Sequence, residues 1–182
     1  MKRTPDQALA ALESQIRTWA RTPRPPEIRI LDYPPEQEAV MLGRIRSLVR
    51  RLEEEGLQVE VEDVGQGFRA ALEGQPVVER LLALDGSQDR HIIHDLGVLA
   101  SRYLRDLFRR PPSAGAVCRL LVNSGALATV TSYSAVTNEL YGAKGEAGPA
   151  APAIIAFPGE ADDRSMNLLG LRRETNYRTP RI

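Results

Sequence analysis

The sequence predicts a single α/β domain in which a mainly parallel sheet of four to five strands carries helices on both faces. Short apolar, β-branched runs alternate along the chain with longer segments whose apolar residues recur at the helical period. The first alternation, strand–helix–strand over residues 28–64, forms a βαβ unit, and such crossovers join parallel strands. The 182 residues, 42% of them hydrophobic, are sufficient for one core. We therefore treat residues 1–182 as one domain, with residues 1–27 as an N-terminal helix and Pro-rich connection.

The N-terminal third is predicted to supply two helices and two strands. Residues 5–20 carry apolar residues at helical spacing, and the prolines of "RTPRPPE" then enforce an extended connection. "IRIL" (28–31) is the first strand. A helix follows "DYPPEQE", with Glu36 and Glu38 in its first turn, where the helix dipole favours anions. "LQVEVEDV" (57–64) alternates apolar and polar residues, which predicts a strand near a sheet edge.

The middle of the chain is predicted to be helical. Two short helices are expected at "FRAALEG" (68–74) and "PVVERLLAL" (76–84). A long helix is expected over residues 89–110, because its apolar residues recur along one face and "PPSAG" then ends it.

The last third is predicted to add the remaining strands. "VCRLLV" (117–122) is the third strand, and a helix and a turn-rich linker follow it. "AIIAF" (153–157) is almost wholly apolar, which predicts a central strand buried on both faces. A short helix near residues 166–171 and a last strand over residues 177–182 close the chain. Together these elements predict a Rossmann-like arrangement.

Composition excludes several classes of protein. Lys and Arg total 24 and Asp and Glu total 24, so no net charge steers the chain to nucleic acid or to an acidic membrane. No apolar run approaches the roughly 20 residues of a membrane-spanning helix, and the N-terminus lacks the pattern of a signal peptide. The single cysteine, Cys118, lies in a strand-like run, which indicates a buried inert thiol and a reducing compartment. We therefore expect a cytoplasmic protein.

Standard catalytic motifs do not match this sequence. The P-loop pattern has no counterpart, and "DYPPEQ" occupies the place of a Rossmann glycine fingerprint. Ser124 in "NSGAL" falls where a hydrolase nucleophile would, but its frame departs from G-x-S-x-G, so a turn or helix cap is the better interpretation. His91 and His94 share a helix face and are interpreted as surface neighbours. We expect neither a cofactor nor a catalytic residue.

An acidic cluster follows the fourth predicted strand. Loops that follow parallel strands meet at one edge, so residues 32–35, 123–126 and 158–163 are expected to lie close together. Asp32, Glu160, Asp162 and Asp163 would then be candidate magnesium ligands of a metal-assisted phosphohydrolase. The alternative interpretation is that the acidic residues cap the short helix predicted around residue 166.

Basic residues gather near the C-terminus. Arg172, Arg173, Arg178 and Arg181 could bind phosphates, as in a DNA-binding accessory subunit, or meet an acidic protein. Because the chain has no net charge and few aromatic residues, we favour a protein interface or a salt-bridged surface.

Three segments resemble a known family. These are "ILDYPPEQEAVMLGRIRSLVRRLEEEGLQVEVEDV", "LLVNSGAL" and "IIAFPGEADDRSMNLLGLRRETNYRTPRI". Their order and spacing resemble those of BrxB, a small component of BREX phage-defence systems, from about residue 28 onward. The most specific motifs are "DYPP" and "FPGE…D…S…L.G", the latter followed by "NYR".

This resemblance implies a non-catalytic subunit. BrxB-like proteins are encoded beside PglZ, an alkaline-phosphatase-like protein, and the resemblance implies an adaptor that binds PglZ and other BREX subunits. We expect no direct contact with nucleic acid or a membrane, and no metal. The expected docking surface is the carboxyl edge of the sheet or the basic C-terminal segment. Its candidate residues are Asp32, Tyr33, Pro34, Pro35, Pro158, Gly159, Glu160, Arg172, Arg173, Tyr177 and Arg178.

Overall fold

The centre of the computed structural model is a parallel sheet, as predicted. The structure describes residues 4–22, 25–76, 78, 90–128, 130–142, 148–161, 165–168, 172–175 and 181–182. The parallel strands are β1 (Ile28–Tyr33), β2 (Gln58–Asp63), β3 (Ala116–Val122) and β4 (Ala153–Ala161). They lie in the order β2–β3–β4–β1, with every adjacent pair parallel. The predicted edge position of β2 and central position of β4 are confirmed.

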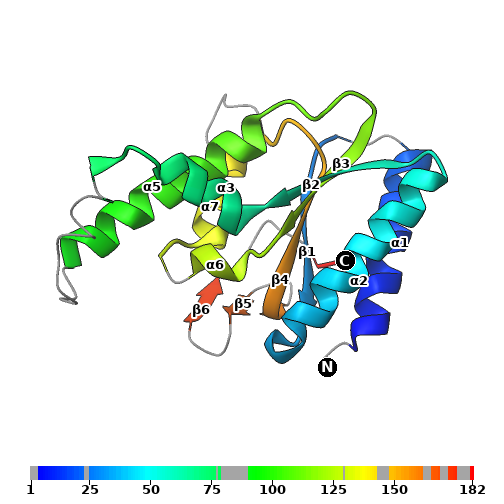
Figure 1. Ribbon diagram of the computed structural model, residues 1–182, viewed down its shortest axis with the longest axis horizontal. Coiled ribbons are helices and arrows are strands. Elements are labelled where there is room, and N and C mark those ends of the chain that lie inside the picture. Colours follow the sequence, from blue (N-terminus) through cyan, green and yellow to red (C-terminus); the bar gives the residue numbers. More distant parts are fainter. Residues whose placement is uncertain are drawn as a thin grey trace.

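The connections place helices on both faces of this sheet. Helix α2 (Glu38–Glu54), preceded by the 3₁₀ turn η1 (Pro35–Gln37), carries the chain from β1 past β4 and β3 to β2. The chain then returns strand by strand through the helices of the other face. These are α3 (Val64–Leu72), α5 (Arg90–Arg109), α6 (Gly125–Ala128) and α7 (Tyr133–Gly142). Crossovers of one hand that run in opposite directions must cover opposite faces, which gives the three layers seen in Figure 1.

The first helical layer consists of α1 (Pro5–Arg21) and α2. Helix α1 begins with a capping box, in which Thr4 and Gln7 satisfy each other's backbone amides, and has Pro5 in its first turn. Its apolar face packs with α2 against the sheet. The buried residues of α1 are Ala8, Leu12, Ile16 and Trp19, and those of α2 are Met41, Ile45, Leu48, Val49 and Leu52.

The second layer covers the opposite face of the sheet. Helices α3, α5, α6 and α7 share one apolar cluster with side chains of β1, β3 and β4. Helix α5 contributes Ala100, Leu104, Leu107 and Phe108 as fully buried residues. None of the helices in the described ranges combines the length and the apolar character that a membrane crossing requires.

Helix α3 begins earlier than the sequence predicted. The strand expected over residues 57–64 ends at Asp63, and Val64 already belongs to α3. The Asp63 carboxylate accepts a hydrogen bond of 3.0 Å from the backbone amide of Gln66, so it acts as the N-cap. The alternating pattern extends the predicted strand through Val64, and the helix was expected only from residue 68, four residues too late.

The predictions for the C-terminal region were wrong in two respects. Strand β4 does not end at residue 157 but continues through Pro158 and Gly159 to Ala161. Where the short helix was expected, the chain forms strand β5 (Ser165–Leu168), and β6 (Arg172–Thr175) follows it. Both pair in antiparallel fashion, β5 with the end of β4 and β6 with β5.

Pro158 is compatible with β4 because it lies between the part of β4 that pairs with β3 and the part that pairs with β5. The ladder between β3 and β4 reaches only as far as Ile155, and the one to β5 begins at Gly159. Proline has a φ compatible with β structure, and it is tolerated where a ladder hydrogen bond is not required of its nitrogen. The helix expected around residue 166 is replaced by β5 (Ser165–Leu168).

Two predicted elements fall mainly outside the described residues. The expected helix over residues 76–84 retains only residues 76 and 78. Of the strand expected over residues 177–182, Arg181 forms an isolated parallel bridge with Ile30, and the Ile182 amide donates to the Ile30 carbonyl at 3.0 Å.

Candidate functional site

The carboxyl edge of the parallel sheet contains a point where the chain leaves in opposite directions. After β1 the chain passes to α2 on one face, and after β3 it passes to α6 on the other, with β4 between the two strands. In doubly wound sheets such a topological switch point opens the crevice in which ligands bind. This edge is therefore the candidate functional site.

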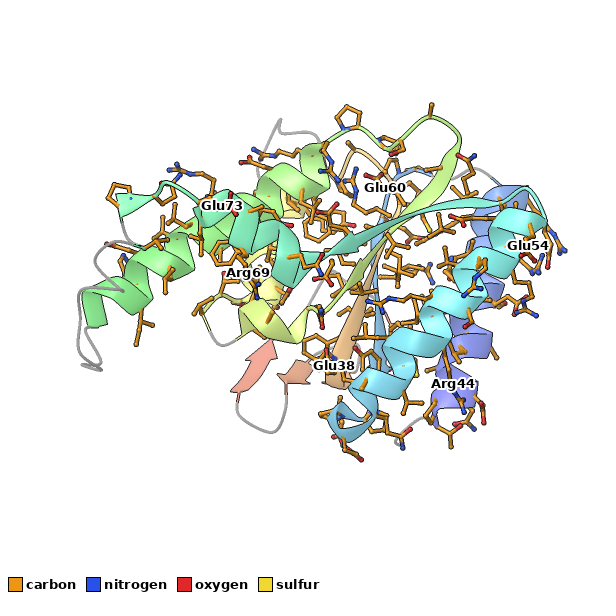
Figure 2. The ribbon with its side chains drawn as sticks, viewed as in Figure 1. Glu38, Arg44, Glu54, Glu60, Arg69 and Glu73 are labelled. Carbon is orange, nitrogen blue, oxygen red and sulfur yellow. The ribbon has the colours of Figure 1, made fainter. Side chains whose placement is uncertain are left out.

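The described parts of the three segments predicted to gather at this edge lie close together. A Cβ atom built on Gly125 would lie 3.1 Å from Cγ of Pro158 and 3.7 Å from Oε1 of Glu38. The chain after β3 thus lies against both β4 and the start of α2. Figure 2 shows Glu38 at the start of α2, beside the carboxyl end of β4.

Asp32 is held by an ion pair at this edge. Its side chain is buried, and Oδ1 accepts a hydrogen bond of 2.6 Å from Nε of Arg181. The second oxygen accepts a longer one, 3.4 Å, from the Ala161 amide. The carboxylate therefore joins β1 to the end of β4 and to the C-terminal residues.

Ser124 serves the fold of the loop after β3. Its side chain is fully buried, and its hydroxyl donates to the Ala156 carbonyl at 2.6 Å. Asn123 has a φ of 58°, in the left-handed region that asparagine tolerates, and its Nδ2 donates to Asp63 at 3.0 Å. These contacts agree with the interpretation of Ser124 as a turn residue and fix the loop to both neighbouring strands.

Glu38 also lies at this edge. The sequence predicted only that it would occupy the first turn of a helix, where the helix dipole favours an anion. It is half-buried, and burial raises its pKa above the ordinary value for glutamate. Within the described residues, no hydrogen bond or ion pair reaches its carboxylate. The signal that could have found it is position, because the first turn after a switch-point strand borders the crevice.

Tyr33 approaches the same place from β1. Its side chain is 1% exposed and packs with α1 and α2, yet its hydroxyl makes no hydrogen bond to any described residue. Burial raises the pKa of Tyr33, and the negative charge of the nearby Glu38 raises it further. Most buried polar groups in proteins are hydrogen-bonded, so the unpaired hydroxyl of Tyr33 is unusual.

The other expected docking residues are only partly accessible. Asp32, Tyr33, Pro158 and Gly159 are buried, Pro34 and Pro35 are half-buried, and Glu160 is exposed. Glu160 lies on β4 opposite Asn167 rather than in a loop. The backbones of Arg172 and Arg173 belong to β6. Tyr177, Arg178, Asp162 and Asp163 lie outside the described residues.

A second polar cluster lies toward the opposite end of the sheet, where Figure 2 labels Glu60. Arg119, buried on β3, donates to the Leu107 carbonyl and, at 3.1 Å, to the carbonyls of Arg110 and Pro111, so it caps the end of α5. Its guanidinium also pairs with Glu60 at 3.1 Å.

Glu60 is held as an anion in this cluster. Burial alone would raise its pKa, but the Ser113 amide and the guanidinium groups of Arg119 and Arg110 outweigh that effect and lower the pKa. A pocket of about 370 Å³ adjoins the cluster. It is lined by Glu53, Gln58, Val59, Glu60, Ser113 and Ala116. The contacts of Glu60 are those of a structural ion pair.

Metal-ligating side chains are dispersed in the described ranges. No group of three or more His, Cys, Asp or Glu residues is positioned there to hold an ion. His94 is exposed, and the side chain of His91 is not described. Cys118 is fully buried, which raises its pKa to about 12 and agrees with an inert thiol.

No protein-family model, curated protein or solved structure matches this chain.

Proposed function

We propose that this chain is a non-catalytic adaptor of a BREX phage-defence assembly, and that it binds a PglZ-like protein through the carboxyl edge of its sheet. The resemblance of three sequence segments to the BrxB family supplies the partner. The observation that supports a binding role is that polar side chains at the candidate site are already hydrogen-bonded within this chain. Asp32, Ser124 and Asn123 are each engaged by other parts of this chain.

These hydrogen bonds hold the carboxyl edge of the sheet in one conformation. Each of these contacts joins segments that are distant in sequence, and Asp32 and Arg181 are 149 residues apart. A surface whose backbone is held in place by buried side chains beneath it loses little conformational entropy when a partner docks. A preorganised edge of this kind suits an adaptor whose task is to hold another protein.

The phosphohydrolase alternative receives less support from the same geometry. A magnesium ion needs several oxygen ligands from carboxylates and water. At Asp32 the ion would have to compete with the Arg181 guanidinium, which already neutralises the carboxylate. Calorimetry with magnesium or manganese measures this competition, and Asp32→Asn would abolish any heat that arises at this site.

Co-purification tests the adaptor role directly. The chain and a PglZ-like protein from the same genome are expected to elute together at micromolar concentration and moderate salt. Separate elution would contradict direct binding. Duplex DNA serves as the comparison, since retention by DNA that weakens steeply with salt would favour the nucleic-acid alternative instead.

A further inference from the structure

We infer that the free edge of β2 binds an extended segment of another protein by strand addition, and that a Lys or Arg side chain of this segment enters the pocket at the amino end of β2. This pocket, of about 370 Å³, is lined in part by Glu53 and Glu60. It lies away from the carboxyl edge of the sheet, so the inference goes beyond the proposed function and does not depend on the partner proposed there.

The first argument is that β2 offers an unpaired strand edge. It is the terminal strand of the sheet and, among the described strands, pairs with β3 alone. Alternate backbone amides and carbonyls of an edge strand point away from its neighbour, which makes the strand a template for another one. The register with β3 is regular over residues 59–63, so this stretch can accept an added strand. Figure 1 shows β2 crossing the view from the end of α2 to the start of α3.

The second argument is that the usual protection of a free edge is weak on β2. Edge strands are commonly protected by lysine, proline or unpaired charges. Strand β2 contains neither Lys nor Pro. The carboxylates of Glu60 and Glu62 are held by the Arg110 guanidinium at 2.9 Å and 2.8 Å. Val61 between them is 40% exposed, and a side chain of an added strand would cover it.

The third argument is the position of the pocket beside this edge. Its lining includes Gln58, Val59 and Glu60, which are the first residues of β2. Glu53, from the last turn of α2, contributes to the lining as well. In strand addition the backbone hydrogen bonds supply affinity, and pockets beside the edge select particular side chains. A strand added to β2 would therefore pass the opening of a pocket that can hold one of its side chains.

The fourth argument selects a basic side chain. The carboxylates on β2 are already offset by the guanidinium groups of Arg110 and Arg119. The charge left in the pocket lining is that of Glu53, whose carboxylate has no hydrogen bond or ion pair within the described residues. Lys and Arg combine a long apolar stem with a cationic end, which suits a pocket that ends on a carboxylate. A second copy of β2 fits less well, because its own charged side chains are acidic.

Selection from a library of random decapeptides displayed on phage tests the inference with the purified chain. Binders are expected to carry a Lys or Arg within an alternating run of strand-forming residues. In amide hydrogen exchange, a synthetic copy of one binder should slow exchange at the outward amides of residues 59–63 about tenfold or more. A library that yields no binder, or only binders that protect other segments, would overturn the inference.

Two N-methylated versions of that peptide separate backbone pairing from side-chain contact. Methyl groups on one set of alternate amides should weaken binding about tenfold or more, because an added strand directs alternate amides to β2. The other set points to solvent, and its methylation should change the affinity by less than about threefold. Equal losses from the two sets would contradict strand addition.

Charge reversal at Glu53 tests the pocket. Glu53→Lys is expected to weaken binding of the peptide about tenfold or more, because it opposes the basic side chain at close range. Glu54→Lys is the matched control, since Glu54 (labelled in Figure 2) is the next residue of α2, is exposed and is outside the pocket lining. It should stay within about threefold of the wild-type affinity. Equal losses in the two variants would indicate a diffuse field rather than a pocket.

Replacing the basic residue of the peptide by Gln completes the comparison. This peptide should bind the wild type and Glu53→Lys with nearly the same affinity, because the two charges act on each other. Thermal unfolding of Glu53→Lys should match that of the wild type, since the Glu53 carboxylate holds no other described residue.

Sedimentation of the free chain tests the competing occupant of the edge. A dimer that Val61→Lys converts to a monomer would assign the β2 edge to a second copy and overturn the inference. None of these measurements uses the PglZ-like protein, so failure of the adaptor role and failure of strand addition are distinguishable.

Discussion

The guanidinium of Arg181 donates to the carboxylate of Asp32 across an Nε–Oδ1 distance of 2.6 Å. This contact fastens the C-terminal residues to β1, where Arg181 also bridges Ile30 through the backbone. The Asp32 side chain is 6% exposed and that of Arg181 is 23% exposed, so the pair is largely shielded from solvent. An ion pair in such a position is costly to break from one side.

Asp32→Asn is expected to lower the free energy of unfolding by about 2 kcal/mol, because it leaves a shielded guanidinium without its charge partner. Urea denaturation measures the difference. The control is Arg44→Gln, which breaks the exposed pair with Asp6 and should change stability by less than about 0.5 kcal/mol. Equal losses in the two variants would mean that the Asp32 pair contributes no more than a surface contact.

The Glu60 carboxylate makes stability depend on pH. Its folded-state pKa lies below the ordinary value of 4.5, so its contribution is present above that value and is lost as the pH falls through the folded-state pKa. The urea midpoint of the wild-type protein should therefore fall in this acid range. Glu60→Gln should be less stable at neutral pH and show a shallower acid decline. An unchanged acid slope in the variant would assign the decline to other carboxylates.

Glu38 should give the opposite dependence. Burial raises its pKa in the folded state, so its contribution to stability is greatest below its unfolded-state pKa and is lost as the pH rises through the folded-state value. Glu38→Gln is therefore expected to be at least as stable as the wild type at neutral pH, with a difference that vanishes in acid. Denaturant midpoints at several pH values measure this. Destabilisation at neutral pH would show that the fold itself uses the charge.

Two helical glycines should respond in opposite ways to replacement by alanine. A Cβ at Gly97 in α5 would lie 2.6 Å from the backbone oxygen of Val130, so Gly97→Ala is expected to cost about 2 kcal/mol. A Cβ at Gly43 in α2 would meet nothing within 4 Å, so Gly43→Ala should stabilise by about 0.5–1 kcal/mol. Thermal unfolding of the two variants checks both signs, and a stabilised Gly97→Ala would contradict the close approach of the Val130 carbonyl to α5.

Local patterns were sufficient to predict most elements of the fold. Apolar spacing and the Thr4–Pro5 start define α1, and the apolar run over residues 153–157 marks the central strand. The errors arose where pairing with a neighbouring strand determines the structure more strongly than the local sequence does. Pro158 indicates a turn when its sequence is considered alone, but it pairs with Tyr33 and continues β4. The strand β5 likewise depends on its pairing with β4 rather than on its own four residues.

The candidate site was predictable in its location and only partly in its residues. The convergence of the loops after β1, β3 and β4 follows from parallel strands alone. The pairing of Asp32 with Arg181 and the approach of Glu38 to Gly125 join positions far apart in sequence. Periodicity reports which face of an element is buried, but it does not report which polar group from a distant segment lies above it.

The place of β1 in the sheet also bears on how the protein is made. Among the described strands, β1 pairs with β4, so Ile28 must wait for Ala153 before its strand hydrogen bonds can form. Contacts of such large sequence separation slow folding, and an emerging chain cannot complete them early in synthesis. The first strand therefore leaves the ribosome long before its partner, and α1 and α2 can shield its side chains Leu31 and Tyr33 during that interval, whereas Ile28 and Ile30 face the helices that are made later.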